Sequence, residues 1–223
     1  MKTFFITASG TEIGKTFVTT LLTTQLTHSG YRVRALKPLV TGFDSACPEN
    51  SDSDLLLRAV GLQLNEKNLA RVSPWRFSAA LSPDVAAELE SRNIDLHELA
   101  DFCLKQEDAD ITLIEGIGGV MVPLNQEHTV LDWIQALRTP VVLVVGSYLG
   151  TLSHTLSAAG MLQARGQTIA GIIISESINQ PMKAEKTVQI LERFLHPIPI
   201  QILPRLESQE AAPSLLTLLD PYL

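Results

Sequence analysis

Residues 3–30 read TFFITASGTEIGKTFVTTLLTTQLTHSG and predict a strand, a turn and a helix, in that order. Phe4–Thr7 is a nearly continuous apolar run of strand length, and Ala8–Gly14 contains the glycines of a turn. From Lys15 to Ser29 apolar residues recur at helical spacing, and Gly30 ends the pattern. This order is typical of a phosphate-binding loop between a buried strand and a helix. The apolar face of the helix consists of Val18, Leu21, Leu22 and Leu26.

The segment Gly10–Thr16 has the residues that bind a nucleoside triphosphate together with Mg²⁺. Backbone N–H groups of the turn and the positive end of the helix attract phosphate. Lys15 reaches the β- and γ-phosphate oxygens, and the Thr16 hydroxyl ligates Mg²⁺. The common pattern G-x-x-x-x-G-K-[ST] places its first glycine at position 9, where this chain has Ser9. A chance Gly-Lys-Thr at a helix start is the alternative, and the flanking strand and helix disfavour it.

Strand-length apolar runs alternate with helical patterns along the rest of the chain. The runs are nearly all apolar, which is typical of strands buried on both faces of a parallel sheet. We therefore expect an α/β fold of P-loop NTPase type, with three layers and helices on both faces of a mostly parallel sheet. Residues 1–223 are expected to form one domain, with a loop at Phe43–Ser53 in the least regular stretch, Gly42–Pro74. The other expected strands are Val33–Leu36, Ile111–Ile114, Val141–Val145, Ile169–Ile174 and Ile198–Leu203, and the other helices are Pro83–Leu89, Leu96–Lys105, Val130–Leu137, Thr155–Ala164 and Ala184–Leu195.

The composition argues against several classes of protein. The chain of 223 residues has a formal net charge of −7, whereas a nucleic-acid surface needs a stripe of Lys and Arg. No apolar run approaches the roughly 20 residues of a membrane span. The first residues, Met1–Thr7, are too short for the apolar region of a signal peptide. Cys47 and Cys103 lack metal-ligand spacing, so we expect free thiols and a cytoplasmic protein.

Carboxylates that could hold Mg²⁺ occur at two places. Glu115 ends the apolar run Ile111–Ile114 and is followed by three glycines in four residues, which favours a ligand close to the backbone. The alternative is a solvent-exposed strand end. Asp52 and Asp54 precede an apolar leucine run, and one of them could be a second carboxylate at the metal. A helix cap or first-turn acid is an equally good interpretation of this pair.

Lys37 directly follows the expected strand Val33–Leu36. Ligands of open parallel sheets bind at the carboxyl ends of the strands, so Lys37 is expected at the same edge as Lys15 and Glu115. There it could contact a γ-phosphate or an anionic substrate. An ordinary exposed lysine is the alternative. Pro38 and the turn at Thr41-Gly42 favour a shaped loop.

Together these motifs resemble dethiobiotin synthetase. The resemblance runs from residue 3 to about residue 207 and is specific, because separate motifs carry the right residues. It rests on Gly10–Thr16, Lys37-Pro38-x-x-Thr41-Gly42, Ser53-Asp54, Glu115-Gly116-x-Gly118-Gly119 and Val145-Gly146-x-x-Leu149-Gly150.

The resemblance implies an ATP-dependent cyclo-ligase of biotin biosynthesis. One amine of 7,8-diaminopelargonate takes up CO₂ as a carbamate, which attacks the γ-phosphate of ATP. The resulting carbamic–phosphoric anhydride is closed to the cyclic urea by the second amine, giving dethiobiotin, ADP and phosphate. No protein nucleophile is needed, so positioning and charge neutralisation supply the catalysis.

The family's functional residues transfer to positions that match its motifs. Thr16, Asp54 and Glu115 match the Mg²⁺ ligands, and a homodimer is implied because the loop at Leu149 and Gly150 resembles one that reaches a neighbouring subunit's site. Lys15, Lys37 and Thr11 are the implied catalytic residues, and Lys37, Thr41, Gly118, Leu149 and Gly150 are the implied substrate contacts. The implied nucleotide contacts are Glu12, Ile13, Gly14, Lys15, Thr16, Phe17, Asp54, Glu115, Gly116, Ile117, Gly118, Ser175, Glu176, Pro204, Arg205 and Leu206.

Three departures from the family pattern stand out. The loop that usually begins Gly-Thr-Asp-Thr is here Ala8–Thr11, and a usual Ser-Pro-His is here Ser82–Asp84. The usual adenine-reading Asn is Ser175, next to Glu176. An Asn amide can pair with a donor and an acceptor of the base, whereas a Ser hydroxyl cannot do so bidentately. We therefore expect weaker base discrimination.

Three other functions are compatible with a phosphate loop. Related ligases of the cobyrinate or formate-activating type usually carry extra domains, for which this chain is short. A ParA-like regulatory ATPase would carry an additional lysine early in the loop, where this chain has Gly10, and often a basic C-terminal helix. Residues 209–223 contain no Lys or Arg. A paralogue that binds nucleotide without closing the ring is the third alternative.

Overall fold

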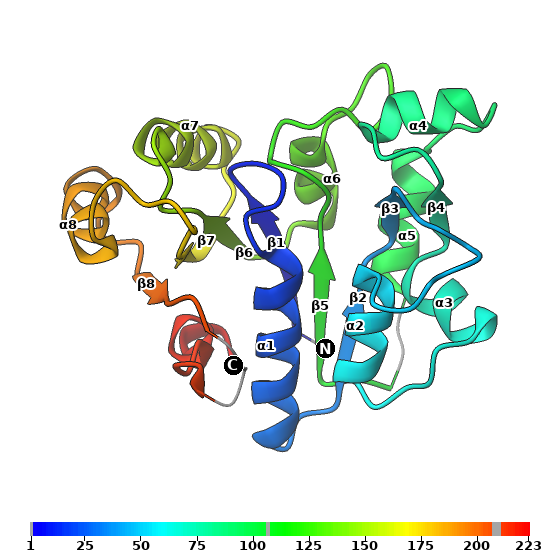
Figure 1. The fold of residues 1–223 in the computed structure, drawn as a ribbon, viewed down its shortest axis with the longest axis horizontal. Coiled ribbons are helices and arrows are strands. Elements are labelled where there is room, and N and C mark those ends of the chain that lie inside the picture. The colour runs from blue at the N-terminus through cyan, green and yellow to red at the C-terminus, as the bar shows by residue number, and fades with distance from the viewer. Residues whose placement is uncertain (1, 106–107, 207–210) are drawn as a thin grey trace.

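A six-stranded parallel sheet forms the centre of the protein. The computed structural model describes residues 2–105, 108–206 and 211–223. The strand order is β2-β5-β1-β6-β7-β8, and every neighbouring pair is parallel (Figure 1). The sheet is therefore built by crossover connections, as the alternation of strands and helices predicted. The strands are β1 (Lys2–Ala8), β2 (Val33–Leu36), β5 (Ile111–Glu115), β6 (Val141–Val145), β7 (Ile169–Ser175) and β8 (Ile200–Leu203).

Helices cover both faces of this sheet (Figure 1). Helix α1 (Lys15–His28) lies on one face, and the two 3₁₀ turns Leu216–Leu218 and Asp220–Tyr222 pack into the same hydrophobic cluster. The other face is covered mainly by four of the remaining helices. These are α5 (Leu96–Leu104), α6 (Val130–Leu137), α7 (Thr151–Ala164) and α8 (Ala184–Leu195).

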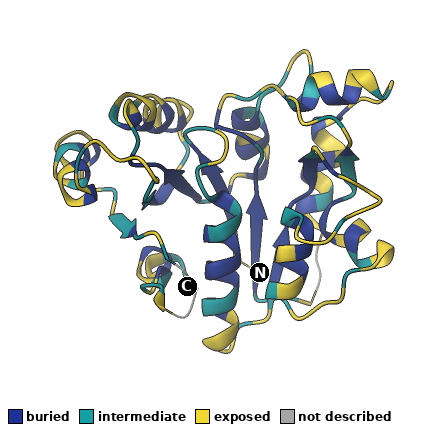
Figure 2. Cartoon of the chain, in the orientation of Figure 1, coloured by how far each residue is buried: buried dark blue, intermediate teal, exposed yellow. Residues whose placement is uncertain are grey.

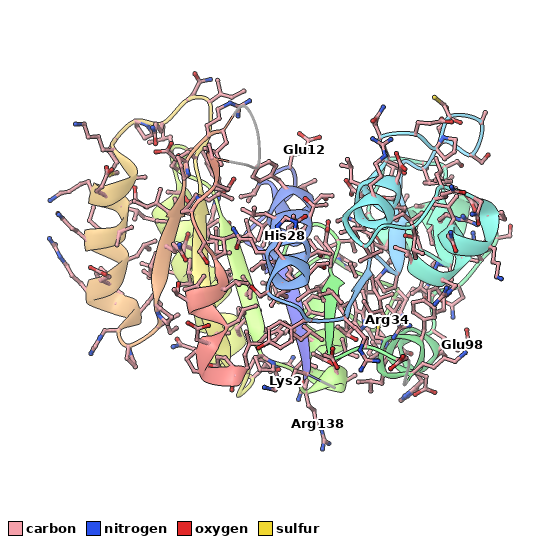
Figure 3. All side chains as sticks on the ribbon, turned by 90° about the horizontal axis from the view of Figure 1, so that it is seen from below. Lys2, Glu12, His28, Arg34, Glu98 and Arg138 are labelled. Atoms are coloured by element: carbon pink, nitrogen blue, oxygen red, sulfur yellow. The ribbon has the colours of Figure 1, made fainter. Side chains whose placement is uncertain are left out.

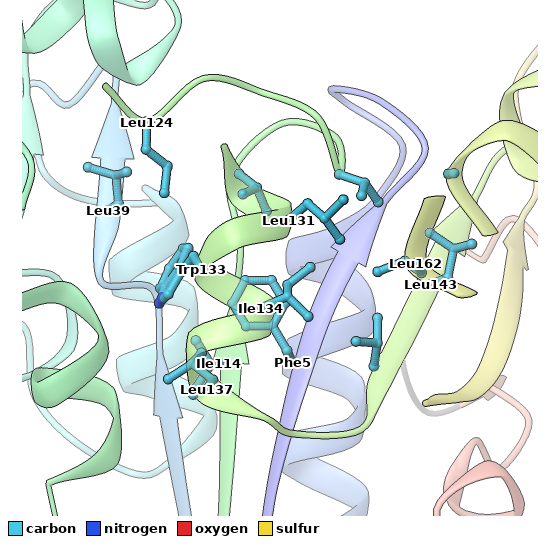
Figure 4. Close-up of a cluster of buried hydrophobic side chains, with 14 of the residues drawn as sticks. Phe5, Leu39, Ile114, Leu124, Leu131, Trp133, Ile134, Leu137, Leu143 and Leu162 are labelled. Atoms are coloured by element: carbon cyan, nitrogen blue, oxygen red, sulfur yellow. The ribbon is translucent and has the colours of Figure 1, made fainter. Parts of the chain in front are cut away.

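Each central strand supplies both hydrophobic cores, because successive side chains point to opposite faces. Phe4 packs with α1, whereas Phe5 packs with the helices of the opposite face. The ring of Phe5 meets that of Trp133 edge to face, with centroids 4.8 Å apart (Figure 4). The strands are accordingly buried along nearly their whole length, while exposed residues are concentrated on the outer helices and loops (Figure 2).

The predicted α/β fold with a parallel sheet is confirmed, and the region after residue 38 is more regular than expected. Strands β3 (Leu39–Thr41) and β4 (Trp75–Phe77) form a separate two-stranded parallel sheet. Helix α2 (Asp52–Ala59) begins inside the expected loop, where the Ser51 hydroxyl accepts a hydrogen bond from the Asp54 N–H. Helices α3 (Glu66–Val72) and α4 (Pro83–Leu89) follow.

Helix α7 begins at Thr151, four residues before the expected start at Thr155. Gly150 adopts a left-handed conformation with φ 98°, and the Thr151 hydroxyl donates to the Gly146 carbonyl at 2.6 Å. These two features fix the first turn, although the sequence before Thr155 lacks apolar periodicity. No described helix has the length and apolar character that a membrane crossing requires.

Strand register brings the ends of three strands together. Ile6 of β1 is paired with Glu115 of β5, and Leu36 of β2 is paired with Ile114. Lys37, the residue after Leu36, therefore lies beside Glu115, and the phosphate loop starts three residues after Ile6, at Ser9. The backbone hydrogen bonds of the sheet thus set the spacing of the candidate site.

Candidate nucleotide and substrate site

The segment from Ser9 to Gly14 connects β1 to α1 at the carboxyl edge of the sheet. Gly14 has φ 98°, and a Cβ there would lie 2.8 Å from the Ser175 hydroxyl, so glycine is needed for both conformation and space. Glu12 also has a positive φ, 57°, and projects outward from the loop (Figure 3). Gly10 is not among the residues with positive φ. The positive φ angles of Glu12 and Gly14, rather than Gly10, therefore shape this turn.

Four side chains from four separate elements meet behind the loop. The Thr16 hydroxyl donates to Glu115 Oε1 at 2.7 Å, and the Lys37 ammonium donates to the same oxygen at 2.6 Å. Lys37 Nζ also lies 2.7 Å from Asp52 Oδ2. Lys15 Nζ contacts instead the Gly10 carbonyl oxygen at 3.4 Å. The two lysines therefore lie at the same edge of the sheet, as expected, but they contact different groups: Lys37 contacts carboxylates and Lys15 contacts a backbone carbonyl.

The charges in this cluster shift one another's pKa values. Burial lowers the pKa of Lys15 to about 8, and the positive charge of Lys37 adds to this effect, against the attraction of Glu115 and Asp52. For Lys37, burial also opposes the charged form, but the attraction of Glu115 and Asp52 outweighs it and raises the pKa. Burial works against the charged form of Asp52, yet Lys37 holds the pKa of this carboxyl below its usual value. Lys37 therefore stays positively charged between the carboxylates of Glu115 and Asp52.

The second carboxylate that faces Lys37 in this cluster is Asp52, whereas Asp54, the Mg²⁺ ligand that the resemblance implies, has other partners. Asp54 accepts a hydrogen bond from the Asn50 N–H at 2.8 Å and forms an ion pair with Arg58 one helical turn later. Two residues along a helix are separated by about 200° around its axis, so only one of the two aspartates can face Lys37. The alternative interpretation of the pair as first-turn acids of a helix is confirmed, since both aspartates lie in the first turn of α2.

A cavity of about 760 Å³ opens in front of these side chains. The predicted residues Thr11, Lys15, Lys37 and Thr41 all line it, so the structure brings the implied catalytic residues together. One wall comes from residues 80–83, before and at the start of α4, which the motif analysis did not assign to the site. The counterpart of the family's Ser-Pro-His at Ser82–Asp84 overlaps this wall, but its place at the site depends on the packing of α4 against β3 and β4. The full lining is Thr11, Glu12, Ile13, Gly14, Lys15, Thr16, Lys37, Val40, Thr41, Asp52, Ala80, Leu81, Ser82, Pro83, Ile117, Gly118 and Val122.

The three glycines after Glu115 are tightly packed, and Gly119 lies directly against the phosphate loop. A Cβ on Gly116 would lie 2.8 Å from the Phe5 ring, and one on Gly119 would lie 3.2 Å from the Gly10 nitrogen. Gly118 has φ 56°, and a Cβ there would lie 2.5 Å from a methyl group of Val122. Gly119 is needed because two backbone segments touch, whereas Gly116 and Gly118 are needed because a Cβ would clash with the side chains of Phe5 and Val122. Ile117 and Gly118, expected at the site, line the cavity, whereas Gly116 lies beneath it.

The residues expected around the base are grouped at the ends of β7 and β8. Ser175 ends β7 beside Gly14, and the Glu176 carboxylate accepts the Arg205 N–H at 3.2 Å. Pro204 and Arg205 directly follow β8. Phe17 and Leu206 pack against the same hydrophobic cluster, on the α1 side of the sheet.

Leu149 and Gly150 do not line the cavity of their own chain. They lie between β6 and α7, and the Leu149 side chain is 84% exposed. Beside them is a smaller cavity of about 280 Å³, formed by residues 9–13 of the loop together with Tyr148, His154 and Ser177. The expected role of Leu149 and Gly150 in a neighbouring subunit's site stays a prediction.

The residues around Glu115 fit a divalent cation. Glu115 Oε2 is buried and has no hydrogen-bond partner among the described residues, although the other oxygen of the same carboxylate has two. A buried carboxylate oxygen without a partner is costly and is a natural ligand for a hard cation. Thr16 and Asp52 supply two further oxygens nearby. In the described part of the chain no group of three or more His, Cys, Asp or Glu side chains could hold a metal.

The parallel sheet with its phosphate loop, lysines and terminal carboxylate defines a P-loop NTPase-type protein. A family model described as an AAA domain matches residues 2–212. The ATP-dependent dethiobiotin synthetase BioD of Acidiphilium cryptum (strain JF-5) is 45% identical over 89% of this chain and 91% of its own length. That of Caulobacter vibrioides (strain NA1000 / CB15N) is 42% identical over 95% and 96%. The chain belongs to the dethiobiotin synthetase family.

Solved structures with low sequence identity share the fold. The MinC:MinD cell division protein complex of Aquifex aeolicus matches with a TM-score of 0.56 at 12% identity, over 93% of this chain and 83% of that one. A ParA family ATPase from Chlorobium tepidum TLS matches with a TM-score of 0.55 at 15% identity, over 92% and 85%. At these identities the likeness concerns the fold alone, and the closer sequence relatives favour the ligase family over a ParA-like switch.

Proposed function

We propose that this protein carboxylates 7,8-diaminopelargonate with CO₂ and closes the cyclic urea of dethiobiotin at the expense of ATP. The observation that carries this proposal is one cavity lined by Lys15, Lys37, Thr11 and Thr41, next to the Thr16–Glu115 pair. Two lysines and two hydroxyls around such a space suit a reaction between two anions, a carbamate and a γ-phosphate, that would otherwise repel each other.

Each side chain has a role in this scheme. Lys15 neutralises the β- and γ-phosphates, and Lys37 neutralises the carbamate and the phosphoryl group it attacks. Thr11 and Thr41, which both line the cavity, position the diamine. No protein group forms a covalent bond, so the rate comes from alignment of the carbamate oxygen with the phosphorus and from charge neutralisation.

Mg²⁺ fits this scheme with Thr16, Asp52 and Glu115 as the protein ligands. Asp52 takes the place that the family resemblance gave to Asp54, because only Asp52 contacts the cluster. When bound, the ion would supply Lewis-acid stabilisation of the charge on the transferred phosphoryl group. The buried, partnerless Glu115 Oε2 supports this assignment.

Further parts of the proposal concern the nucleotide and the assembly. Ser175, Glu176 and residues 204–206 flank the base beyond Gly14, and Glu12, Ile13 and Phe17 belong to the loop side. We place Leu149 and Gly150 at the site of a neighbouring copy, since the exposed Leu149 side chain suits a homodimer contact. One domain over residues 1–223, a cytoplasmic location, and no nucleic-acid or membrane partner complete the proposal.

Product formation tests the assignment directly. The protein is incubated with ATP, Mg²⁺, bicarbonate and 7,8-diaminopelargonate, and the cyclic urea is measured by mass spectrometry. Production of dethiobiotin in step with ADP is the expected result. ADP release that does not depend on the diamine, or no product, would favour a paralogue without ring-closing activity.

Lys37→Ala separates binding from catalysis. We expect ring formation to be lost while nucleotide binding stays measurable, because Lys15 and the loop backbone still hold the phosphates. The matched variant Lys105→Ala, at the end of α5 and outside the cavity, should turn over normally. Unchanged turnover of Lys37→Ala would remove Lys37 from the catalytic residues.

A further inference from the structure

The Lys37 ammonium contacts the same carboxylates that the proposed function assigns to the divalent cation. Lys37 Nζ lies 2.6 Å from Glu115 Oε1 and 2.7 Å from Asp52 Oδ2. The Thr16 hydroxyl also points at Glu115 Oε1. Asp52 and Glu115, two of the three proposed protein ligands of Mg²⁺, therefore already bind a cation, which is the Lys37 ammonium, and the third ligand, Thr16, is bonded to Glu115.

One ammonium and one divalent cation cannot both take this position. A charge of +2 within a few ångströms of Lys37 would repel it strongly, because the shared carboxylates carry only two negative charges. The four charged groups Lys15, Lys37, Asp52 and Glu115 are already balanced. Any added cation therefore has to displace a positive charge from the carboxylates.

Lys37 has the freedom to move while its backbone stays fixed. The Lys37 N–H donates to the Val72 carbonyl at 3.2 Å, and the residue follows the buried end of β2. Its side chain lines the cavity of about 760 Å³, so rotation about the four-carbon stem carries the ammonium into that space. Lys15 lines the same cavity but contacts the Gly10 carbonyl rather than a carboxylate.

We propose that Lys37 and the divalent cation bind the Asp52–Glu115 pair in alternation, so that cation binding moves the Lys37 ammonium into the cavity. This deepens the proposed function and rests on it for the identity of the ligands. Metal loading then delivers the charge that neutralises the reacting anions. A cavity without the cation keeps this charge on the carboxylates, where it cannot promote phosphoryl transfer.

Cation binding without nucleotide tests the alternation. Mn²⁺ is titrated into the wild-type chain, Lys37→Met and Lys15→Met, and free Mn²⁺ is followed by electron paramagnetic resonance. Met keeps the length of the stem and removes the charge. We expect Lys37→Met to bind Mn²⁺ at least about tenfold more tightly than wild type, since no buried ion pair has to be broken. Lys15→Met, which removes an equal charge from the same cavity, should stay within about threefold of wild type.

Two results would overturn the proposal. One is Mn²⁺ affinity of Lys37→Met that is unchanged, weaker or absent. The other is an equal gain in Lys15→Met, which would reduce the effect to general repulsion in the cavity. Lys37→Gln, which removes the charge but keeps a polar side chain, repeats the test in case Lys37→Met does not fold.

A measurement on the wild-type chain needs no substitution. With ¹⁵N-labelled lysine, the Lys37 ammonium signal is assigned by its loss in Lys37→Gln and followed as Mg²⁺ and ADP are added. We expect a shift and faster hydrogen exchange as the ion pairs break, and an unchanged signal would contradict the alternation. Dethiobiotin formation is measured separately: its absence rejects the proposed function but leaves the cation result standing, and normal product with no Mn²⁺ effect rejects only the alternation.

Discussion

At the scale of single residues, Asp52 and Asp54 show how two adjacent acids differ in their partners. Asp52 is the first residue of α2 and meets Lys37, whereas Asp54 is 1% exposed and bound by Asn50 and Arg58. The first contact belongs to the candidate site, and the second holds the start of the helix. Their substitutions should therefore have different consequences.

We expect Asp52→Asn to reduce Mg²⁺-dependent turnover about 100-fold or more, because a charged ligand of the cation is lost. Asp54→Asn should keep its kcat and lower the free energy of unfolding by about 1–3 kcal/mol, since a buried carboxylate loses a charged hydrogen bond. Steady-state kinetics and urea unfolding of both variants measure these effects. The reverse pattern would return Asp54 to the metal site.

The lowered pKa of Lys15 predicts that the protein takes up a proton when nucleotide binds. Burial lowers the pKa of this lysine to about 8, so at pH 9 the free protein holds it largely deprotonated. Phosphate next to the ammonium raises that pKa again, and binding therefore takes up a proton at pH 9 but almost none through Lys15 at pH 6.5. Calorimetric titrations with ADP in buffers of different ionisation enthalpy measure this number. Equal uptake at both pH values would contradict the shift.

At the scale of elements, the ends of β7 and β8 form the proposed base side. Ser175 offers one hydroxyl where an Asn would offer a donor and an acceptor. We expect ATP, CTP and GTP to support turnover within about tenfold of one another, and Ser175→Asn to favour ATP several-fold. Comparison of kcat/KM for the three nucleotides tests this. A strong ATP preference in the wild type that is lost by substituting a residue other than Ser175 or 204–206 would contradict it.

The same scale shows what the sequence could predict. The six strands of the main sheet were recognised because continuous apolar runs such as Val141–Val145 are typical of strands buried on both faces. The three-residue strands β3 and β4 and helix α3 were not predicted, and α2 was indicated only by the alternative interpretation of its two aspartates. The two strands are too short for periodicity, and the whole region is held by capping and tertiary contacts such as the hydrogen bond between Ser53 and Ser73.

Some residues of the candidate site could be predicted from the sequence and others could not. Residues at strand ends, such as Lys37 and Glu115, could be predicted because sheet register fixes them. The wall at residues 80–83 could not, since it depends on how α4 packs far from the phosphate loop in sequence. The choice of Asp52 over Asp54 needed the exact first residue of a helix, which a pattern locates only within a few residues.

At the scale of the whole molecule, the two cysteines report on the integrity of the core. Cys103 of α5 is fully buried, and burial raises the pKa of its thiol to about 12, whereas Cys47 is exposed. We expect the folded chain to react quickly with one equivalent of a thiol reagent at pH 8 and the unfolded chain with two. Cys47→Ser should remove the fast reaction. A fast second equivalent in the folded state would mean that the α5 side of the core opens readily.

The parallel direction of every strand has a practical consequence for engineering. Chemistry is confined to one rim of the sheet, so the turns at the other rim are free to accept added chain. Gly30 precedes β2 and Gly166 precedes β7, and no atom lies within 4 Å of a Cβ placed on either. A peptide tag or fluorescent reporter spliced in after Gly166 would sit a full strand length away from the phosphate loop. The fold thus provides an attachment point for tethering this protein to a surface or to another enzyme.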